Sequence, residues 1–229
     1  MRLSSVSLLI SRVALAVPLV FAISPAFGDA RLRNQEIGQC SAADIATWGD
    51  GQDRTALARS FSFSYQHSGA PPWFREQQVL ELLRNAAAEW SKCGIPSQVT
   101  VATAAQPAEP GMVIVYWDTS PTVGPFGLAN LTAQRLSLGR QAFHLLRQRN
   151  PAHDATDTLQ MVLSHEMGHF YGLVAHSRRC VDVLSYYHDG KGNQCFTHFP
   201  ELLKSFPEYR SSLPTACDIQ RCRSVNRLP

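Results

Sequence analysis

Hydrophobic and polar residues follow distinct patterns along the chain. Residues 61–65 alternate between aromatic side chains and serine, the period-2 pattern of a strand with one buried face. Between residues 74 and 93 apolar side chains recur at helical spacing, and Gly94 follows as a C-cap. Residues 112–117 form a continuous apolar run, which is typical of a strand covered on both faces. These patterns predict a strand, a helix and a buried strand, in that order.

Weaker patterns predict the remaining elements. Three further short strands are predicted at residues 99–101, 124–131 and 135–138. Residues 151–172 place apolar side chains on one helical face, and the glycine at the end of this range is positioned to stop the helix. A last helix is predicted from Thr215, which forms a pattern resembling a capping box with Asp218. The order of elements indicates an α+β or α/β domain with a helix-on-sheet core.

The first 28 residues have the order of a secretory signal peptide. Two arginines, Arg2 and Arg12, precede an apolar run at residues 13–23, and small residues lie before the expected cleavage point. Because this run is much shorter than the roughly 20 residues that span a bilayer, we expect cleavage near Gly28 and no membrane span afterwards. The mature chain, residues 29–229, is then expected to be one domain, with residues 29–58 as a polar N-terminal extension.

Composition narrows the class of protein. With 229 residues, 45% hydrophobic and 17% charged, the chain has enough apolar content for one buried core and is not of disordered composition. The net charge of +3 includes two arginines of the signal segment, so the mature chain is nearly neutral and we expect no nucleic-acid partner. All six cysteines follow the signal segment and none forms a CxxC pair, which predicts up to three disulfides in a secreted or periplasmic protein.

The informative motif lies in the helix predicted at residues 151–172. His165 and His169 are four residues apart, so both imidazoles lie on one helical face and can reach one ion. Glu166 lies beside that ion and can accept a proton from zinc-activated water. Gly172 permits the sharp turn that brings His176 toward the same point. The pattern His-Glu-x-x-His arises by chance in roughly one chain in a hundred, and the later glycine and histidine make chance agreement much rarer.

This stretch resembles the zinc signature of the metzincin metalloproteases, H-E-x-x-H-x-x-G-x-x-H, with further likeness to the matrixin branch. Residues 182–187 resemble the family's Met-turn beneath the zinc, and residues 213–220 resemble the start of its last helix. The resemblance implies a twisted, mostly parallel sheet with an antiparallel edge strand, an active-site helix and a C-terminal helix. It also implies zinc as the cofactor and a polypeptide substrate that lies extended along an edge strand at residues 124–131.

The sequence departs from the family pattern at two positions. The third histidine, His176, lies one residue late, so Asp182 and His188 remain alternatives as the third ligand. Leu184 replaces the methionine of the turn, and because leucine is close in volume we expect the packing beneath the metal to survive.

By the same resemblance, Tyr186 is a candidate to stabilise the oxyanion of the reaction, and packing in the turn is the other interpretation. Cys180 and Cys195 flank the turn and are expected to brace it as a disulfide. Cys40 precedes the first strand, where a matrixin propeptide would hold its switch cysteine, but the surrounding residues do not match that switch. We therefore expect Cys40 in a disulfide, with Cys93 as its partner, and no cysteine switch.

The sequence thus predicts a secreted, monomeric zinc endopeptidase with His165, His169 and His176 as ligands and Glu166 as general base. The first alternative is a non-catalytic secreted zinc-binding protein on the same fold. The second is another lineage of the motif, whose third ligand is a later glutamate such as Glu201 or Glu208. The intact Glu166 argues against the first, and His176 argues against the second.

Overall fold

The computed structural model describes residues 25–102 and 109–228. The predicted signal segment lies outside the described residues except for its last four, which begin a helix. The helices, including two short 3-10 helices, are α1 (Pro25–Gly38), η1 (Ala42–Asp44), α2 (Glu76–Ser91), α3 (Arg140–Arg149), α4 (Ala155–Phe170), η2 (Pro200–Lys204) and α5 (Ala216–Asn226). The strands are β1 (Phe61–Tyr65), β2 (Ser97–Val101), β3 (Met112–Asp118), β4 (Gly127–Asn130) and β5 (Arg135–Gly139).

The five strands form one sheet in the order β2-β1-β3-β5-β4. Neighbouring strands are parallel except β4, which pairs antiparallel with β5 and forms one edge of the sheet. The mostly parallel sheet with an antiparallel edge strand confirms the predicted α+β fold class. It also places β4, at the position predicted for an edge strand, beside the helix that carries the histidine motif.

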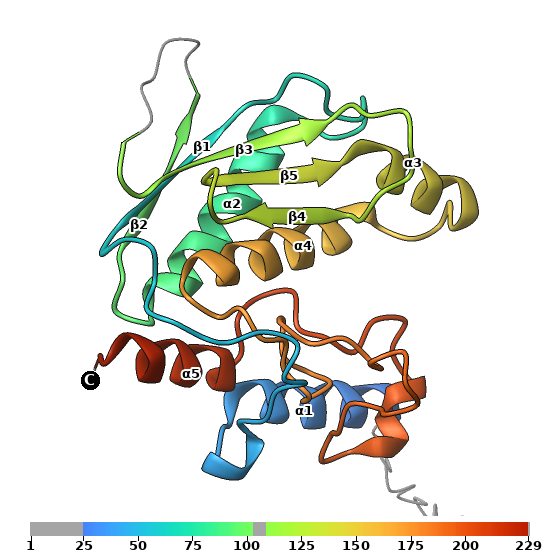
Figure 1. The fold of residues 1–229 in the computed structure, drawn as a ribbon. Helices are drawn as coiled ribbons and strands as arrows, with labels where there is room; N and C mark the ends of the chain where they lie inside the picture. Colours follow the sequence, from blue (N-terminus) through green and yellow to red (C-terminus); the bar gives the residue numbers. More distant parts are fainter. Residues whose placement is uncertain (1–24, 103–108, 229) are drawn as a thin grey trace, which may run out of the picture.

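Helix α4 lies between the sheet and a second, lower part of the molecule (Figure 1). It contacts both α2 and the edge strand β4. The main core lies between the sheet and the helices α2 and α4, and Phe63, Leu83, Trp90 and Leu163 are fully buried there. This core packs α4 against the sheet next to the edge strand.

The lower part combines both ends of the described chain with the long segment after α4. Figure 1 shows α1 and α5 beneath α4, together with the mostly irregular residues 171–215. Its smaller core is built around Cys180, Val181, Leu202 and Tyr209. The predicted polar extension is therefore packed structure, since Glu36 of α1 is buried and accepts hydrogen bonds from Tyr209 and from two residues of the segment before η2.

Three disulfides connect the described residues: Cys40–Cys217, Cys93–Cys222 and Cys180–Cys195. The predicted bridge between Cys180 and Cys195 is confirmed. The predicted pairing of Cys40 with Cys93 is wrong, because the end of α2 lies against α5 and the chain after α1 meets the first turn of the same helix. Helix α5 is thus tied to both parts of the fold, which its sequence pattern does not indicate.

Within the described ranges, no helix has the length and apolar character needed to cross a membrane.

The sequence patterns missed α1 entirely and did not resolve α3 as a separate helix. The first turn of α5 is as predicted, because Thr215 and Asp218 form a reciprocal capping box.

Candidate metal centre

Helix α4 begins and ends at residues that its sequence specifies. The side chain of Asp154 caps the helix by accepting a hydrogen bond from the backbone N of Thr156 at 2.8 Å. At the other end Gly172 has φ +98°, and its N–H donates to the carbonyl of His169. A Cβ at Gly172 would collide with the carbonyl oxygen of Arg54, so a glycine is required both for the turn and for this close approach.

The turn at Gly172 brings three imidazoles together. Ligand atoms of His165, His169 and His176 all lie within 4.8 Å of one another. The Nε2 atoms of His165 and His176 are 3.2 Å apart, and the three ring centroids are separated by 5.1 to 5.2 Å. The first two rings come from one face of α4, and the third comes from the loop that follows it.

The outer nitrogen of each ring is engaged. Nδ1 of His165 lies 2.8 Å from the carbonyl of Val183, and Nδ1 of His169 lies 2.7 Å from the carbonyl of Leu173. Because a carbonyl oxygen only accepts hydrogen bonds, these Nδ1 atoms carry the proton and the neutral rings keep a lone pair on Nε2.

Nδ1 of His176 lies 2.7 Å from Oδ2 of Asp50. The carboxylate accepts a hydrogen bond from Nδ1 of this ring, as the carbonyls do from the other two. All three Nε2 atoms are therefore available to one shared partner.

Burial favours the neutral form of His165 and His169 in the protein without metal. It lowers the pKa of His169 to about 4 and holds the pKa of His165 well below its usual value. For His165, the charges of the two neighbouring imidazoles add to this lowering. Neutral imidazole is the form that binds a transition metal.

The cluster fits a tetrahedral zinc ion. Zinc–nitrogen bonds of about 2.0–2.1 Å at tetrahedral angles place ligand nitrogens about 3.4 Å apart, close to the 3.2 Å between His165 and His176. Asp182 and His188, the alternative third ligands, are not part of this group among the described residues. Asp182 is buried and accepts hydrogen bonds from Ser177 and Thr215. His188 is exposed in the turn beyond.

Residues 46–57, which we call the strap, run along the loop that carries His176. The strap contacts this loop through backbone hydrogen bonds, among them Arg54 N to the carbonyl of Gly172 and Trp48 N to the carbonyl of His176. Two carboxylates of the strap bind loop amides: Asp53 accepts from Ala175 N and Asp50 accepts from His176 N, both at 3.0 Å. These contacts hold the loop, which is one residue longer than the family pattern.

Sequence reasoning missed the strap. Its residues Asp50-Gly51-Gln52-Asp53 have the composition of a turn, and no helical or strand period connects them to the histidine motif. The signal that could have revealed the strap is its pair of aspartates on either side of a glycine. Asp50 contacts His176, which lies 126 residues later in the sequence, so no local pattern connects the two.

Glu166 lies on the side of α4 that faces the edge strand. It is 9% exposed, and its Oε2 accepts a hydrogen bond from the backbone N of Ala129 in β4 at 2.8 Å. Burial raises its pKa to about 7, although the hydrogen bond from Ala129 acts in the opposite direction. None of the salt bridges in the described part of the chain involves Glu166, so the carboxylate is not neutralised by a cation.

Leu184 lies in the turn that follows the third histidine and packs against α4. Leu184 is fully buried, and a Cβ on Gly168 of α4 would lie 3.0 Å from its Cδ1. The carbonyl of Leu184 accepts a hydrogen bond from Ser177 N, directly after the third histidine. Leu184 therefore fills the space under the helix between the two motif histidines.

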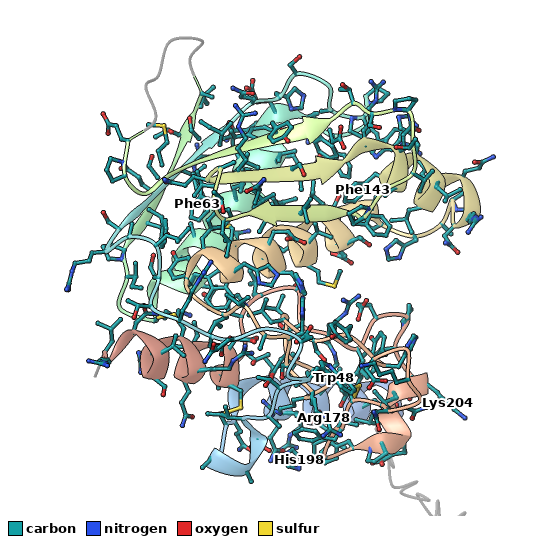
Figure 2. The ribbon with its side chains drawn as sticks, viewed as in Figure 1. Trp48, Phe63, Phe143, Arg178, His198 and Lys204 are labelled. Carbon is teal, nitrogen blue, oxygen red and sulfur yellow. A yellow bond between two sulfur atoms is a disulfide. The ribbon has the colours of Figure 1, made fainter. Side chains whose placement is uncertain are left out.

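Tyr186 lies beside the cluster, with its ring centroid 4.8 Å from that of His176. Its hydroxyl donates to Oδ2 of Asp50 at 2.6 Å, and its ring stacks on Trp48 at 5.5 Å. Burial would raise the pKa of Asp50, but hydrogen bonds from Tyr186 and His176 outweigh burial and lower it. Trp48 and the cation that covers it, Arg178, lie together in the lower part of the molecule (Figure 2).

The later glutamates that were alternative ligands lie elsewhere. Glu208 forms a salt bridge with Arg210 at 2.6 Å and also accepts a hydrogen bond from Tyr187. Glu201 lies exposed on η2. Neither belongs to the histidine group among the described residues.

Comparisons with known proteins give limited information. No protein family matches the chain, and no curated protein matches it. One similar solved structure is a chain of the GM1-bound form of the ECX AB5 holotoxin, 12% identical with a TM-score of 0.45; the match covers 84% of this chain and 90% of that chain. Another is a zinc-dependent peptidase from Methanocorpusculum labreanum, 13% identical with a TM-score of 0.38, over 73% of this chain and 99% of that chain. Similarities at these scores do not identify the function of this chain.

Proposed function

We propose that this chain is a secreted zinc endopeptidase of the metzincin type, with His165, His169 and His176 as ligands and Glu166 as general base. The observation that carries the proposal is the orientation of the three imidazoles. Each has its Nδ1 engaged by an acceptor, and the Nε2 atoms of His165 and His176 lie at the spacing of ligands on one ion.

When bound, zinc supplies Lewis-acid polarisation of the scissile carbonyl and activation of water at neutral pH. The residues of the chain supply the proton transfers. Glu166 accepts the proton of the attacking water and delivers it to the leaving amine. Its raised pKa of about 7 in the protein without metal suits a group that must both accept and release a proton near neutral pH.

The edge strand β4 is the proposed site of substrate docking. In the antiparallel pair with β5, Phe126 and Leu128 direct their backbone groups toward β5, so those of Gly127 and Ala129 point outward over α4, where the N–H of Ala129 donates to Glu166. An extended peptide can pair with this edge as an added strand. Val123 and Leu128 are 61% and 57% exposed beside it and offer apolar contacts to the peptide.

Export is part of the same proposal. The three disulfides fit an oxidising compartment, and the sequence of the first 28 residues supports a cleaved signal peptide. Tyr186 is proposed as the donor that stabilises the oxyanion, because its ring lies 4.8 Å from that of His176. Its one hydroxyl hydrogen is donated to Asp50 in the protein without substrate, so in this role it leaves Asp50 for the oxyanion when the substrate is bound.

The decisive experiment compares the wild type with Glu166→Gln. Glutamine keeps the shape of the side chain and can still accept the hydrogen bond from Ala129, but it cannot act as a base. We expect zinc content to stay at one ion per chain while hydrolysis of casein or gelatin falls by about 10²–10⁴-fold. Equal hydrolysis by both proteins would contradict the proposal. Bound zinc without hydrolysis by the wild type would favour the non-catalytic zinc-binding protein.

A further inference from the structure

Asp50 contacts two residues of the candidate metal centre through one carboxylate. Its Oδ2 accepts from both Nδ1 of His176 and the hydroxyl of Tyr186, at 2.7 and 2.6 Å. Its Oδ1 accepts from the backbone N of His176 at 3.0 Å. The carboxylate therefore binds the third histidine at both its backbone and its ring.

This double contact restricts the ring of His176 more than one hydrogen bond does. Binding of the backbone N places the Cα, and binding of Nδ1 sets the rotation of the imidazole about its side-chain bonds. The other two rings are carried by a rigid helix, whereas His176 lies on an irregular loop. For this ring, the positioning that α4 provides for His165 and His169 has to come from another element.

The strap holds Asp50 in place. Trp48 donates its backbone N–H to the carbonyl of His176, and its ring stacks on Tyr186 with an interplanar angle of 5°. Gly51 approaches the backbone of Val174 so closely that a Cβ there would lie 2.8 Å from its carbonyl oxygen. Asp50 is thus anchored on both sides by contacts with the loop that it organises.

We propose that Asp50 is a positioning residue that directs Nε2 of His176 toward the metal and holds the hydroxyl of Tyr186 beside it. The inference rests on the proposed function, since it concerns the same metal centre. It adds the strap, which lies more than 100 residues before the histidine motif, to the elements that build this centre. Residues that orient a metal ligand through its second nitrogen affect metal affinity by about 10–100-fold.

The test compares wild type, Asp50→Asn and Asp118→Asn. Asparagine keeps the size of the side chain but removes the negative charge that both donors share. Asp118 is an exposed carboxylate at the end of β3 that accepts a hydrogen bond from the backbone N of Ser120, so it controls for loss of one acid. For each protein we would measure the zinc dissociation constant by chelator competition, the visible spectrum of the cobalt-substituted form, and the unfolding temperature without metal.

We expect Asp50→Asn to weaken zinc binding by about 10–100-fold and to alter the cobalt spectrum. We expect Asp118→Asn to match the wild type in both. Zinc affinity of Asp50→Asn within threefold of the wild type, with an unchanged cobalt spectrum, would overturn the inference and leave the proposed function intact. A wild type that does not bind zinc would instead refute the proposed function.

A second measurement needs no variant and applies even if Asp50→Asn does not fold. In zinc-loaded wild type labelled with ¹⁵N, the long-range ¹H–¹⁵N spectrum reports which ring nitrogen carries the proton. We expect His176 to have its proton on Nδ1, hydrogen-bonded to Asp50, and its metal on Nε2. The opposite arrangement for His176 would overturn the inference.

Discussion

The carboxylate of Glu166 on α4 lies 2.8 Å from the backbone N of Ala129 on the edge strand β4. The group proposed as base and the strand proposed to bind the substrate are therefore in direct contact. A peptide paired with the outer edge of β4 would pass beside this carboxylate. The distance between α4 and β4 thus matters for both binding and proton transfer.

Gly127 sets this distance. A Cβ at Gly127 would lie 2.6 Å from Cγ1 of Val162 and 2.7 Å from Cγ of Glu166, so Gly127→Ala must displace either β4 or the Glu166 side chain. We expect the variant to bind zinc like the wild type but to lose at least about tenfold in kcat/KM, as misplaced catalytic groups do. Gly124→Ala is the matched control, because a Cβ there meets nothing within 4 Å. Peptidase kinetics on both variants test the prediction, and equal kcat/KM for the two would contradict it.

The third ligand can be tested by comparing His176→Ala with His188→Ala. His176 belongs to the three-histidine group, whereas His188 is exposed in the next turn. We expect His176→Ala to lose zinc during dialysis against a mild chelator, since two imidazoles alone hold the ion far less tightly. His188→Ala should keep its zinc, as measured by metal analysis. Retention of zinc by His176→Ala would show that another residue completes the site.

Gly172 is predicted to contribute through both its conformation and its contact with the strap. Gly172→Ala places a side chain at φ +98° and against the carbonyl of Arg54, and we expect it to lower the free energy of unfolding by about 1–3 kcal/mol or more. Gly192→Ala is the control. Gly192 has nearly the same φ, +99°, but a Cβ there would have no atom within 4 Å. Denaturant unfolding of both metal-free variants separates the two effects. A Gly172 variant no less stable than the Gly192 variant would show that the strap contact contributes nothing.

The metal-free protein should lose stability on acidification through its buried histidines. Burial lowers the pKa of His169 to about 4 and lowers that of His165 well below its usual value, so the folded state binds fewer protons than the unfolded chain below about pH 6.5. The contribution of these two histidines to the free energy of unfolding is present above the pKa of histidine in the unfolded chain. It is lost as the pH falls from about 7 toward 4. For His169 alone it is on the order of 3 kcal/mol.

The measurement is the difference in unfolding free energy between metal-free wild type and His169→Gln at pH 7.5 and pH 5. We expect the advantage of the wild type to shrink at the lower pH. Asp182 has the opposite effect on the free energy of unfolding, because burial raises the pKa of this carboxyl to about 7 and the charge of Asp218 raises it further. Since both proteins contain Asp182, its effect cancels in the comparison. A difference that does not change with pH would mean that His169 is not buried in its neutral form.

Much of the scaffold follows from local sequence patterns. The alternation at residues 61–65, the helical period before Cys93 and the capping box at Thr215 each predicted an observed element. Helix α1 was missed because the surface it buries includes Glu36, whose burial depends on hydrogen bonds from distant residues. The pairing of Cys40 with Cys93 was wrong for a related reason, since disulfide partners depend on which chain segments meet in three dimensions.

By itself, the sequence determined the two histidines on one helical face, the glutamate next to the first of them, the glycine that ends that helix, and the order of the strands and helices other than α1 and α3. These features depend on contacts between residues a few positions apart, which the periods of the helix and strand dictate. The tertiary structure alone decided that His176 completes the cluster and that Asp50 of the strap holds its ring. The contact between Asp50 and His176 joins segments 126 residues apart, and the packing of the whole chain brings them together.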